Sequence, residues 1–341
     1  RNAAAEAFHE VSAHVESHGT LVLSLAGGVD AEAALAHIAR HEQLFAQHRC
    51  LRRIHAYALR RAGESERADR IEDELGEPSE SFEAYLLGQI ATFAIGREPG
   101  AAERAVHYLA LAVALADSPR FEFYVQLALA ARHADDAEAA RTTARVLESR
   151  FADRPDVWES VGHARAVFDP AGARAAFERA CELEPTAIHY GNLAGAALVL
   201  EDYEAAEAAS RRGLECDAGS AFVRGGLVLA LAGQARHAEA VAEAEATLKV
   251  DPGRTIVLAA LFDGCRELGE LGRAVPSLAR CARALPAAIE PRLLLATCLV
   301  ESDRAELVAK AATVLDEIDR LAPAPEQQAA AAELRRRLDA R

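Results

Sequence analysis

The sequence of 341 residues contains no methionine and only two lysines, Lys249 and Lys310, so nearly all of its positive charge is arginine. Its formal net charge is −15. No basic stretch is long enough to follow a phosphate backbone, so nucleic acid is not expected as a partner. The missing methionine also indicates that the native start is absent or altered, which leaves a removed export signal open.

Long apolar runs and paired cysteines are missing as well. The longest uncharged apolar stretch near the start, residues 21–28, is too short to span a bilayer and lacks a signal-peptide layout. No C-x2-C pair or histidine ladder accompanies the cysteines, which favours buried free thiols in a reducing compartment over disulfides or structural zinc. We therefore expect a soluble cytoplasmic protein with no membrane partner. The six cysteines are Cys50, Cys181, Cys216, Cys265, Cys281 and Cys298.

Alanine, in contrast, is abundant, with 80 residues. Aromatic residues make up only 5% of the chain, and β-branched residues are sparse outside short runs. Alanine is the strongest helix former, and its small side chain allows helices to approach closely. The composition therefore predicts an all-α protein.

The stretch from Trp158 to Pro185 shows how these helices are arranged. At helical spacing, one set of residues shares a face of a first helix and a second set shares a face of the next, which predicts two helices packed antiparallel. The first set is Trp158, Val161 and Gly162; the second is Ala173, Phe177 and Ala180, with Pro185 closing the unit. A second copy of the pattern follows directly, at Tyr190, Asn192, Leu193, Ala194, Tyr203, Ala206 and Leu214.

This pattern resembles the tetratricopeptide repeat, a helix-turn-helix of about 34 residues with the motif W-x2-L-G, A-x3-F and P. The resemblance covers about residues 15–322 and is most specific between residues 121 and 288. It implies an α-solenoid, a right-handed superhelix of about nine helix pairs with a C-terminal capping helix. An alanine at the tight crossing of each pair recurs at intervals of 33 to 37 residues, at Ala34, Ala68, Ala105, Ala140, Ala173, Ala206, Ala240 and Ala274.

The register divides the chain into four parts. Residues 1–14 are a helical lead-in, 15–120 are divergent N-terminal repeats, 121–288 are well-matched repeats, and 289–341 hold a degenerate repeat and the capping helix. In the degenerate repeat Val308 replaces the crossing alanine. Asp30 is expected to cap a helix, residues 96–100 form an insertion in an inter-helix loop, and residues 76–81 have the composition of a linker.

The resemblance also implies that first helices line a concave groove that holds a peptide or a helix. The middle of this groove is small and apolar, which suits an apolar helix or peptide close to the backbone. Alternatively, the small residues only let neighbouring first helices pack tightly. The candidate partner-binding residues are Gln126, Leu129, His133, Glu159, His163, Ile188, Asn192, Gly195, Phe222, Leu229, Asp263 and Arg266.

Histidines concentrate near the start, with seven of the twelve in the first 55 residues. His14 and His18, and likewise His37 and His41, are i,i+4 pairs that could chelate a metal ion. The repeat register instead places His18, His41 and His55 at core positions of one junction, where burial would lower their pKa values. Solvated or core histidines are the simpler interpretation, so no residue is assigned as a metal ligand and a metal site stays an alternative.

Nothing in the sequence indicates catalysis. No serine, cysteine or carboxylate pair comes with an orienting partner, and the loop of residues 26–31 has alanine at both serine positions of the ATP-pyrophosphatase loop it resembles. We expect a non-enzymatic scaffold that binds a protein or peptide and needs no cofactor. The alternative is a recognition arm of a larger enzyme, such as a glycosyltransferase, with its catalytic domain outside this chain. The sequence specifies neither the partner nor the oligomeric state.

Overall fold

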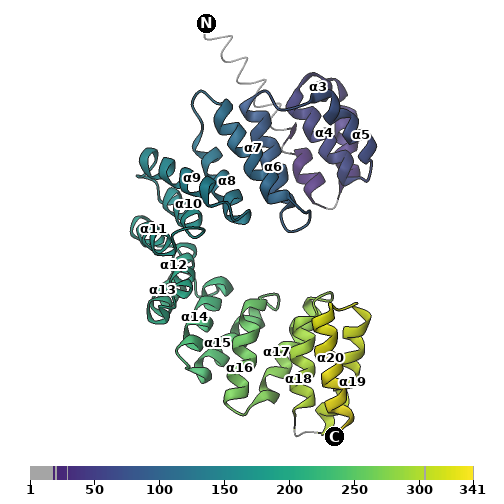
Figure 1. Ribbon diagram of the computed structural model, residues 1–341, viewed down its shortest axis with the longest axis vertical. Helices are drawn as coiled ribbons and strands as arrows, with labels where there is room; N and C mark the ends of the chain where they lie inside the picture. Colours follow the sequence, from purple (N-terminus) through teal and green to yellow (C-terminus); the bar gives the residue numbers. More distant parts are fainter. Residues whose placement is uncertain (1–17, 20, 29, 303–304, 341) are drawn as a thin grey trace. The chain divides into compact units, whose positions relative to one another are not determined.

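The computed structural model describes residues 18–19, 21–28, 30–302 and 305–340, and every regular element among them is helical (Figure 1). This confirms the all-α class. The predicted lead-in over residues 1–14, with His14, lies outside the described residues. In the described ranges no helix is long and apolar enough to cross a membrane. The chain separates into two compact units, Arg1–Asp169 and Pro170–Arg341.

In the first unit, most helices that follow one another in sequence pack side by side (Figure 1). Residues 18–19 and 21–27 are helical and precede α2. The loop between α6 and α7 contains the predicted insertion of residues 96–100, where Gly96 and Gly100 both have positive φ. The remaining helices are α2 (Ala31–Arg40), α3 (Glu42–Gln47), α4 (Arg49–Arg61), α5 (Ser65–Leu75), α6 (Ser81–Ala94), α7 (Ala101–Leu115), α8 (Phe121–His133), α9 (Ala137–Arg150) and α10 (Pro155–Arg165).

The second unit continues the same alternation of first and second helices and ends with α20. Its first helices α12 and α14 contact each other, as do α14 and α16. The elements are α11 (Pro170–Leu183), α12 (Ala187–Val199), α13 (Tyr203–Cys216), α14 (Ala221–Gly233), α15 (His237–Val250), η1 (Thr255–Val257), α16 (Leu258–Glu267), α17 (Leu271–Ala284), α18 (Glu290–Val300), α19 (Ala305–Arg320) and α20 (Pro325–Asp339).

Local chemistry accounts for many of the helix starts. The Asp30 carboxylate accepts a hydrogen bond from the backbone N–H of Ala33 at 2.9 Å, as predicted for an N-cap. Asp136, Asp202 and Thr186 make the equivalent contact at the starts of α9, α13 and α12. Each of these side chains satisfies a backbone donor that the first turn of a helix leaves without an internal partner.

The eight crossing alanines all lie in second helices and are at most 1% exposed. The period found in the sequence is therefore the period of the packed core. In the last pair Val308 is only half-buried, and Ala311, three residues further along α19, is fully buried. The buried alanine is thus shifted by about one turn rather than lost, because residues i and i+3 share a helix face.

Helix α20 closes the apolar core of the second unit. Ala331 and Leu334 are buried in the cluster that α18 and α19 also line. One turn after Ala331, the Arg335 guanidinium lies 2.9 Å from the Asp316 carboxylate and 2.6 Å from that of Asp319, both on α19, whereas Arg336 and Arg337 are exposed. One apolar face and one charged face are what a helix needs to shield a terminal repeat from water.

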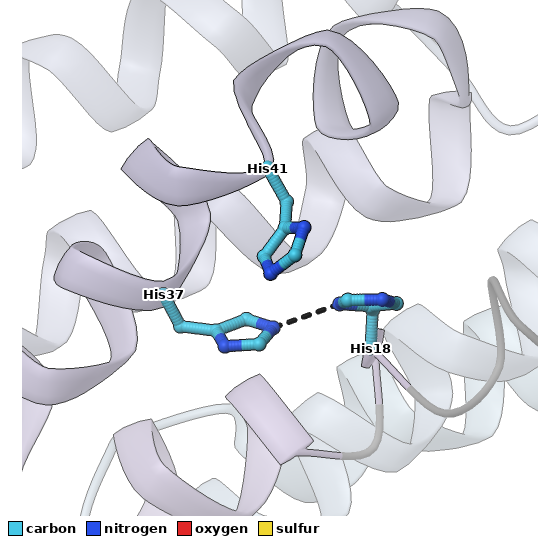
Figure 2. Close-up of side chains that lie close together, drawn as sticks. All are labelled: His18, His37 and His41. Carbon is cyan, nitrogen blue, oxygen red and sulfur yellow. Dashed lines mark hydrogen bonds between the residues drawn. The ribbon is translucent and has the colours of Figure 1, made fainter.

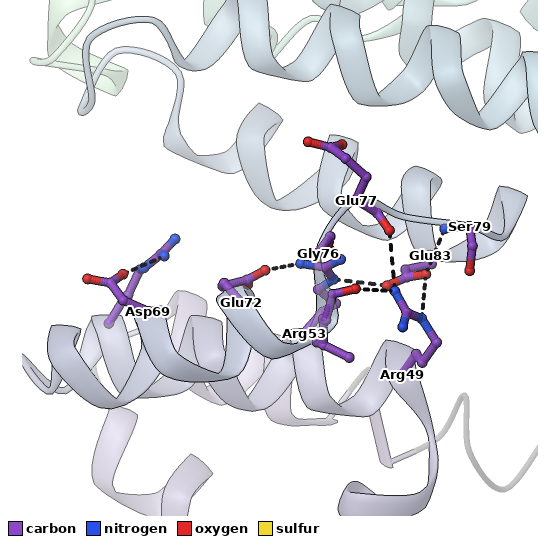
Figure 3. A network of polar contacts seen from close by, with 10 residues as sticks. Arg49, Arg53, Asp69, Glu72, Gly76, Glu77, Ser79 and Glu83 are labelled. Carbon is purple, nitrogen blue, oxygen red and sulfur yellow. Dashed lines mark hydrogen bonds and ion pairs between the residues drawn. The ribbon is translucent and has the colours of Figure 1, made fainter.

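The segment predicted to be a linker, residues 76–81, is held by a buried charge cluster (Figure 3). The Glu83 carboxylate is fully buried and accepts hydrogen bonds from Arg49 Nε at 3.1 Å, Arg53 Nε at 3.0 Å and the Ser79 backbone N–H at 3.2 Å. Arg53 also contacts the Glu72 carboxylate and the Gly76 carbonyl.

These contacts decide the charge state of Glu83. Burial alone would raise the pKa of its carboxyl, but the hydrogen bonds from Arg49 and Arg53 outweigh it and leave the pKa below its usual value. The arginines also donate to backbone carbonyls at the end of α5 and just after it, including that of Leu75 at 2.7 Å from Arg49 Nη2. The cluster therefore fixes the passage from α5 to α6.

The cysteines are free, as expected from their spacing. Four of them, Cys181, Cys265, Cys281 and Cys298, are buried, whereas Cys216 is exposed. Burial raises the pKa of the Cys298 thiol to about 12, so this thiol is protonated at neutral pH. The buried cysteines therefore act as small apolar residues of the core.

The crossing alanines generate a stability prediction. Ala206 is 0% exposed, whereas Ala208, two residues along the same helix α13, is exposed. We expect Ala206→Leu to cost about 1–3 kcal/mol of unfolding free energy, because the added atoms overpack the crossing. Ala208→Leu is the matched control, with an expected change within about 0.5 kcal/mol. Urea unfolding of both variants measures the difference, and equal midpoints would show that the crossing is not tightly packed.

Candidate partner-binding surface

The twelve candidate binding residues all lie on first helices, and none of their side chains is fully buried. They form two surfaces, one in each compact unit. The α8–α10 face consists of Gln126, Leu129, His133, Glu159 and His163. The α12–α16 face consists of Ile188, Asn192, Gly195, Phe222, Leu229, Asp263 and Arg266.

The α8–α10 face is polar. Arg132 Nη1 donates a hydrogen bond to His163 Nδ1 at 2.9 Å, which joins α8 to α10. Arginine has no acceptor, so His163 Nδ1 must accept and the ring proton is on Nε2. That nitrogen faces the Glu159 carboxylate at 3.7 Å. The face thus presents mainly polar and charged side chains beside the half-buried Leu129.

The α12–α16 face is apolar at the start of each repeat. Ile188 is 59% exposed and Phe222 is 40% exposed. Ile256, which is not among the twelve candidates, lies in η1 beside Gly225 of α14, and its side chain is 55% exposed. These three residues follow one another at intervals of 34 residues, and we call them the apolar stripe. Three large apolar side chains in repeat register are more notable than single exposed ones, which are normal on protein surfaces.

Gly191 and Gly195, both on α12, differ in how closely the neighbouring repeat approaches them. At Gly191 a Cβ would lie 2.3 Å from the Phe222 ring, so this position must be small for the next repeat to pack. At Gly195, one turn further along α12, a Cβ would meet nothing within 4 Å. Tight packing of first helices therefore explains Gly191 but not Gly195, where the backbone of α12 is open to an approaching molecule.

Polar groups accompany the apolar stripe. On α16, Arg266 Nη2 lies 2.7 Å from the Asp263 carboxylate, and both side chains are exposed. The Arg254 guanidinium carbon lies 5.2 Å from the centre of the Phe222 ring, within the range of a cation–π contact. The face therefore combines apolar side chains with oriented charges.

The structure brings together a different set of histidines from the one that the repeat register predicts. His18, His37 and His41 gather at the first helices of the chain (Figure 2), whereas His55 lies apart from them on α4. None of the three clustered side chains is fully buried, so they are not core residues. The repeat register does not include His37, whereas the i,i+4 spacing of His37 and His41 already indicated that these two rings share one side of the helix end.

Comparisons with known proteins show the fold alone. No model of a protein family matches the chain, and no curated protein matches it. The crystal structure of the yeast Tom70 is similar with a TM-score of 0.56 and 17% identity, over 85% of this chain and 63% of that chain. A tetratricopeptide repeat protein from Parabacteroides merdae gives a TM-score of 0.46 and 14% identity, over 75% of this chain and 99% of that chain.

The likeness to Tom70 places this chain in the class of tetratricopeptide-repeat-like solenoids, as its repeat pattern predicts. This chain spans less than two thirds of the length of Tom70.

A pH dependence follows from the half-buried His55. Burial and the nearby Arg67 lower its pKa, against the opposing charges of Glu64 and Glu42. A group whose folded pKa is lowered stabilises the fold above its unfolded pKa of about 6.5, and this stability is lost as the pH falls toward the folded pKa. We therefore expect hydrogen-exchange protection of α4 and α5 to fall between about pH 7.5 and pH 5.5 in chelator-treated protein.

The second unit supplies the comparison. Hydrogen bonds from Gln234 and Arg211, together with Arg236, hold the pKa of Glu207 at about 2, so this link between α13 and the start of α15 stays ionised throughout that range. Protection of α13 to α15 should therefore change less. A His55→Gln variant should reduce the pH dependence in α4 and α5, and an unchanged dependence in that variant would contradict the assignment to His55.

Proposed function

We propose that this chain is a non-enzymatic scaffold that binds a segment of another protein on the α12–α16 face. The observation that carries the proposal is the apolar stripe of Ile188, Phe222 and Ile256 beside the open backbone at Gly195. Burial of apolar surface is the main favourable term in protein association, at roughly 25 cal/mol per Å² removed from water. A partner with apolar side chains at matching intervals would cover the stripe.

The shape of the face favours a helix or an extended peptide over a bulky domain. Gly195 adds no side chain to the surface of α12, so a partner backbone can come close there. Leu229 on α14 is half-buried and adds apolar surface between the repeats. The anchors of a helix in a groove recur at one-turn and two-turn spacing, which suits an interaction of this kind.

Charge adds a preference to the shape. The chain has a net charge of −15, and its long-range field attracts partners of opposite sign. On the face itself Asp263 is paired with Arg266, so the preference comes from the net charge of the whole chain. We therefore propose a partner segment that is apolar in its centre and basic in its flanks, in which the charges speed association and the apolar residues give most of the affinity.

Substitutions on the face test the proposal. We expect Gly195→Arg to remove partner capture, because its long side chain would occupy the open position. The substitution replaces a helical glycine by a good helix former, which favours α12 by about 0.5–1 kcal/mol, so unfolding would not explain the loss. Ile188→Glu should have the same effect on capture by placing a charge in the apolar stripe. The measurement is affinity capture with quantitative mass spectrometry, with helix content checked by circular dichroism.

The control is Ala208→Arg, which adds the same side chain to an exposed position of the second helix α13. This variant should capture the same proteins as the unchanged chain. If Gly195→Arg and Ile188→Glu also keep the full set of captured proteins, the α12–α16 face is not the binding surface.

A further inference from the structure

Three imidazole rings at the start of the described chain point toward one another (Figure 2). Every pair among His18, His37 and His41 has ring centres 4.4 to 5.0 Å apart. One nitrogen from each ring can be chosen so that all three lie within 4.8 Å of one another. The closest pair, His18 Nδ1 and His37 Nε2, is 2.8 Å apart.

We propose that His18, His37 and His41 bind one divalent transition-metal ion of the Zn²⁺ type, with a water molecule in the fourth position. The zinc–nitrogen bond is about 2.0–2.1 Å, so a tetrahedral centre places its nitrogen ligands roughly 3.3 Å apart. The spacing of the three rings brackets this value, and small side-chain rotations bring all three nitrogens onto a common ion.

The type of ion follows from the ligands. Imidazole nitrogen suits zinc, copper, nickel and cobalt, whereas calcium and magnesium are bound through oxygen. Three histidines with a water are also a known zinc ligand set. The proposal therefore excludes the alkaline-earth ions and predicts that Co²⁺ replaces Zn²⁺ as a spectroscopic probe.

The backbone holds two of the ligands in fixed positions. His37 lies in the last turn of α2, and His41 occupies the residue between α2 and α3. The His41 N–H donates to the Ile38 carbonyl at 3.0 Å, while its own carbonyl accepts from the backbone N–H groups of Leu44 at 3.0 Å and Phe45 at 3.1 Å. A ligand whose backbone is anchored on both sides loses little conformational freedom on binding.

The third ligand, His18, comes from a different helix, so metal binding would connect two helices. His18 belongs to the helix before α2, so an ion bound by all three rings ties that helix to the junction of α2 and α3. Metal binding adds to the stability of whichever conformation holds the ligands together. We expect the ion to stabilise the N-terminal end of the first unit and to leave the α12–α16 face unaffected. The proposal of a metal site and the proposal of a binding surface can therefore be tested independently.

Metal titration of tag-free, chelator-treated protein tests this site. Calorimetry with Zn²⁺ should give one ion per chain, and Co²⁺ should give the intense visible absorption of a four-coordinate centre. His37→Gln and His41→Gln should each weaken the affinity by more than the roughly 10–100-fold that loss of an outer ligand partner costs. His55→Gln and His48→Gln are the matched controls, because these histidines lie outside the cluster, and both should bind as the unchanged chain does.

A second measurement separates loss of the site from loss of the fold. Added Zn²⁺ should raise hydrogen-exchange protection in residues 31–47 of the unchanged chain and of His55→Gln, but not of His37→Gln. Circular dichroism without metal should be the same for all variants. The proposal is overturned if the unchanged chain binds no ion, if the Co²⁺ spectrum is that of a six-coordinate ion, or if His37→Gln binds zinc within threefold of the unchanged affinity.

Discussion

The rest of the structure depends on one constraint, which is the close crossing of the two helices of each repeat. At the crossings that lie within one compact unit, such as α4 with α5 and α12 with α13, the second helix contributes a buried alanine that is at most 1% exposed. A larger side chain would separate the helices, whereas alanine lets their backbones approach and their flanking leucines and phenylalanines interdigitate. Each second helix packs its alanine side against the first helix of the same repeat. The opposite side of that first helix stays free, and the α12–α16 face is built from these free sides.

A second constraint connects successive repeats at the C-terminal ends of the second helices, where carbonyls in the last turn or just after it have no partner within the helix. Side chains of the next first helix supply donors. Trp158 Nε1 donates to the Ala152 carbonyl at 2.8 Å, His189 Nδ1 to the Glu184 carbonyl at 2.6 Å, and Arg292 Nη2 to the Ala282 carbonyl at 2.9 Å. Three different residue types thus satisfy carbonyls at equivalent places. The repeats can therefore differ in sequence while they keep the same stacking.

Sequence reasoning succeeded where a feature is periodic or local. The crossing alanines repeat along the chain, and the Asp30 cap depends on only a few neighbouring residues, so both could be predicted. It failed where partners come from separate helices without a period. Glu83 looks like any acidic helix residue, and only the fold brings Arg49 and Arg53 to it. The histidine cluster was half predicted, because the i,i+4 spacing pairs His37 with His41, whereas the register had placed His55 of α4 beside His18 and His41.

Hydrogen exchange measured across the whole chain tests the central claim, which is that one register of crossing alanines organises every repeat. The account predicts that within each repeat the slowest-exchanging amides lie in the second-helix turns that contain the crossing alanine, with Ala311 marking this turn in α19. The loop of residues 96–100 should exchange fast. The account would be contradicted if the most protected amides lay half a helix away from these turns, or if protection were uniform along the second helices.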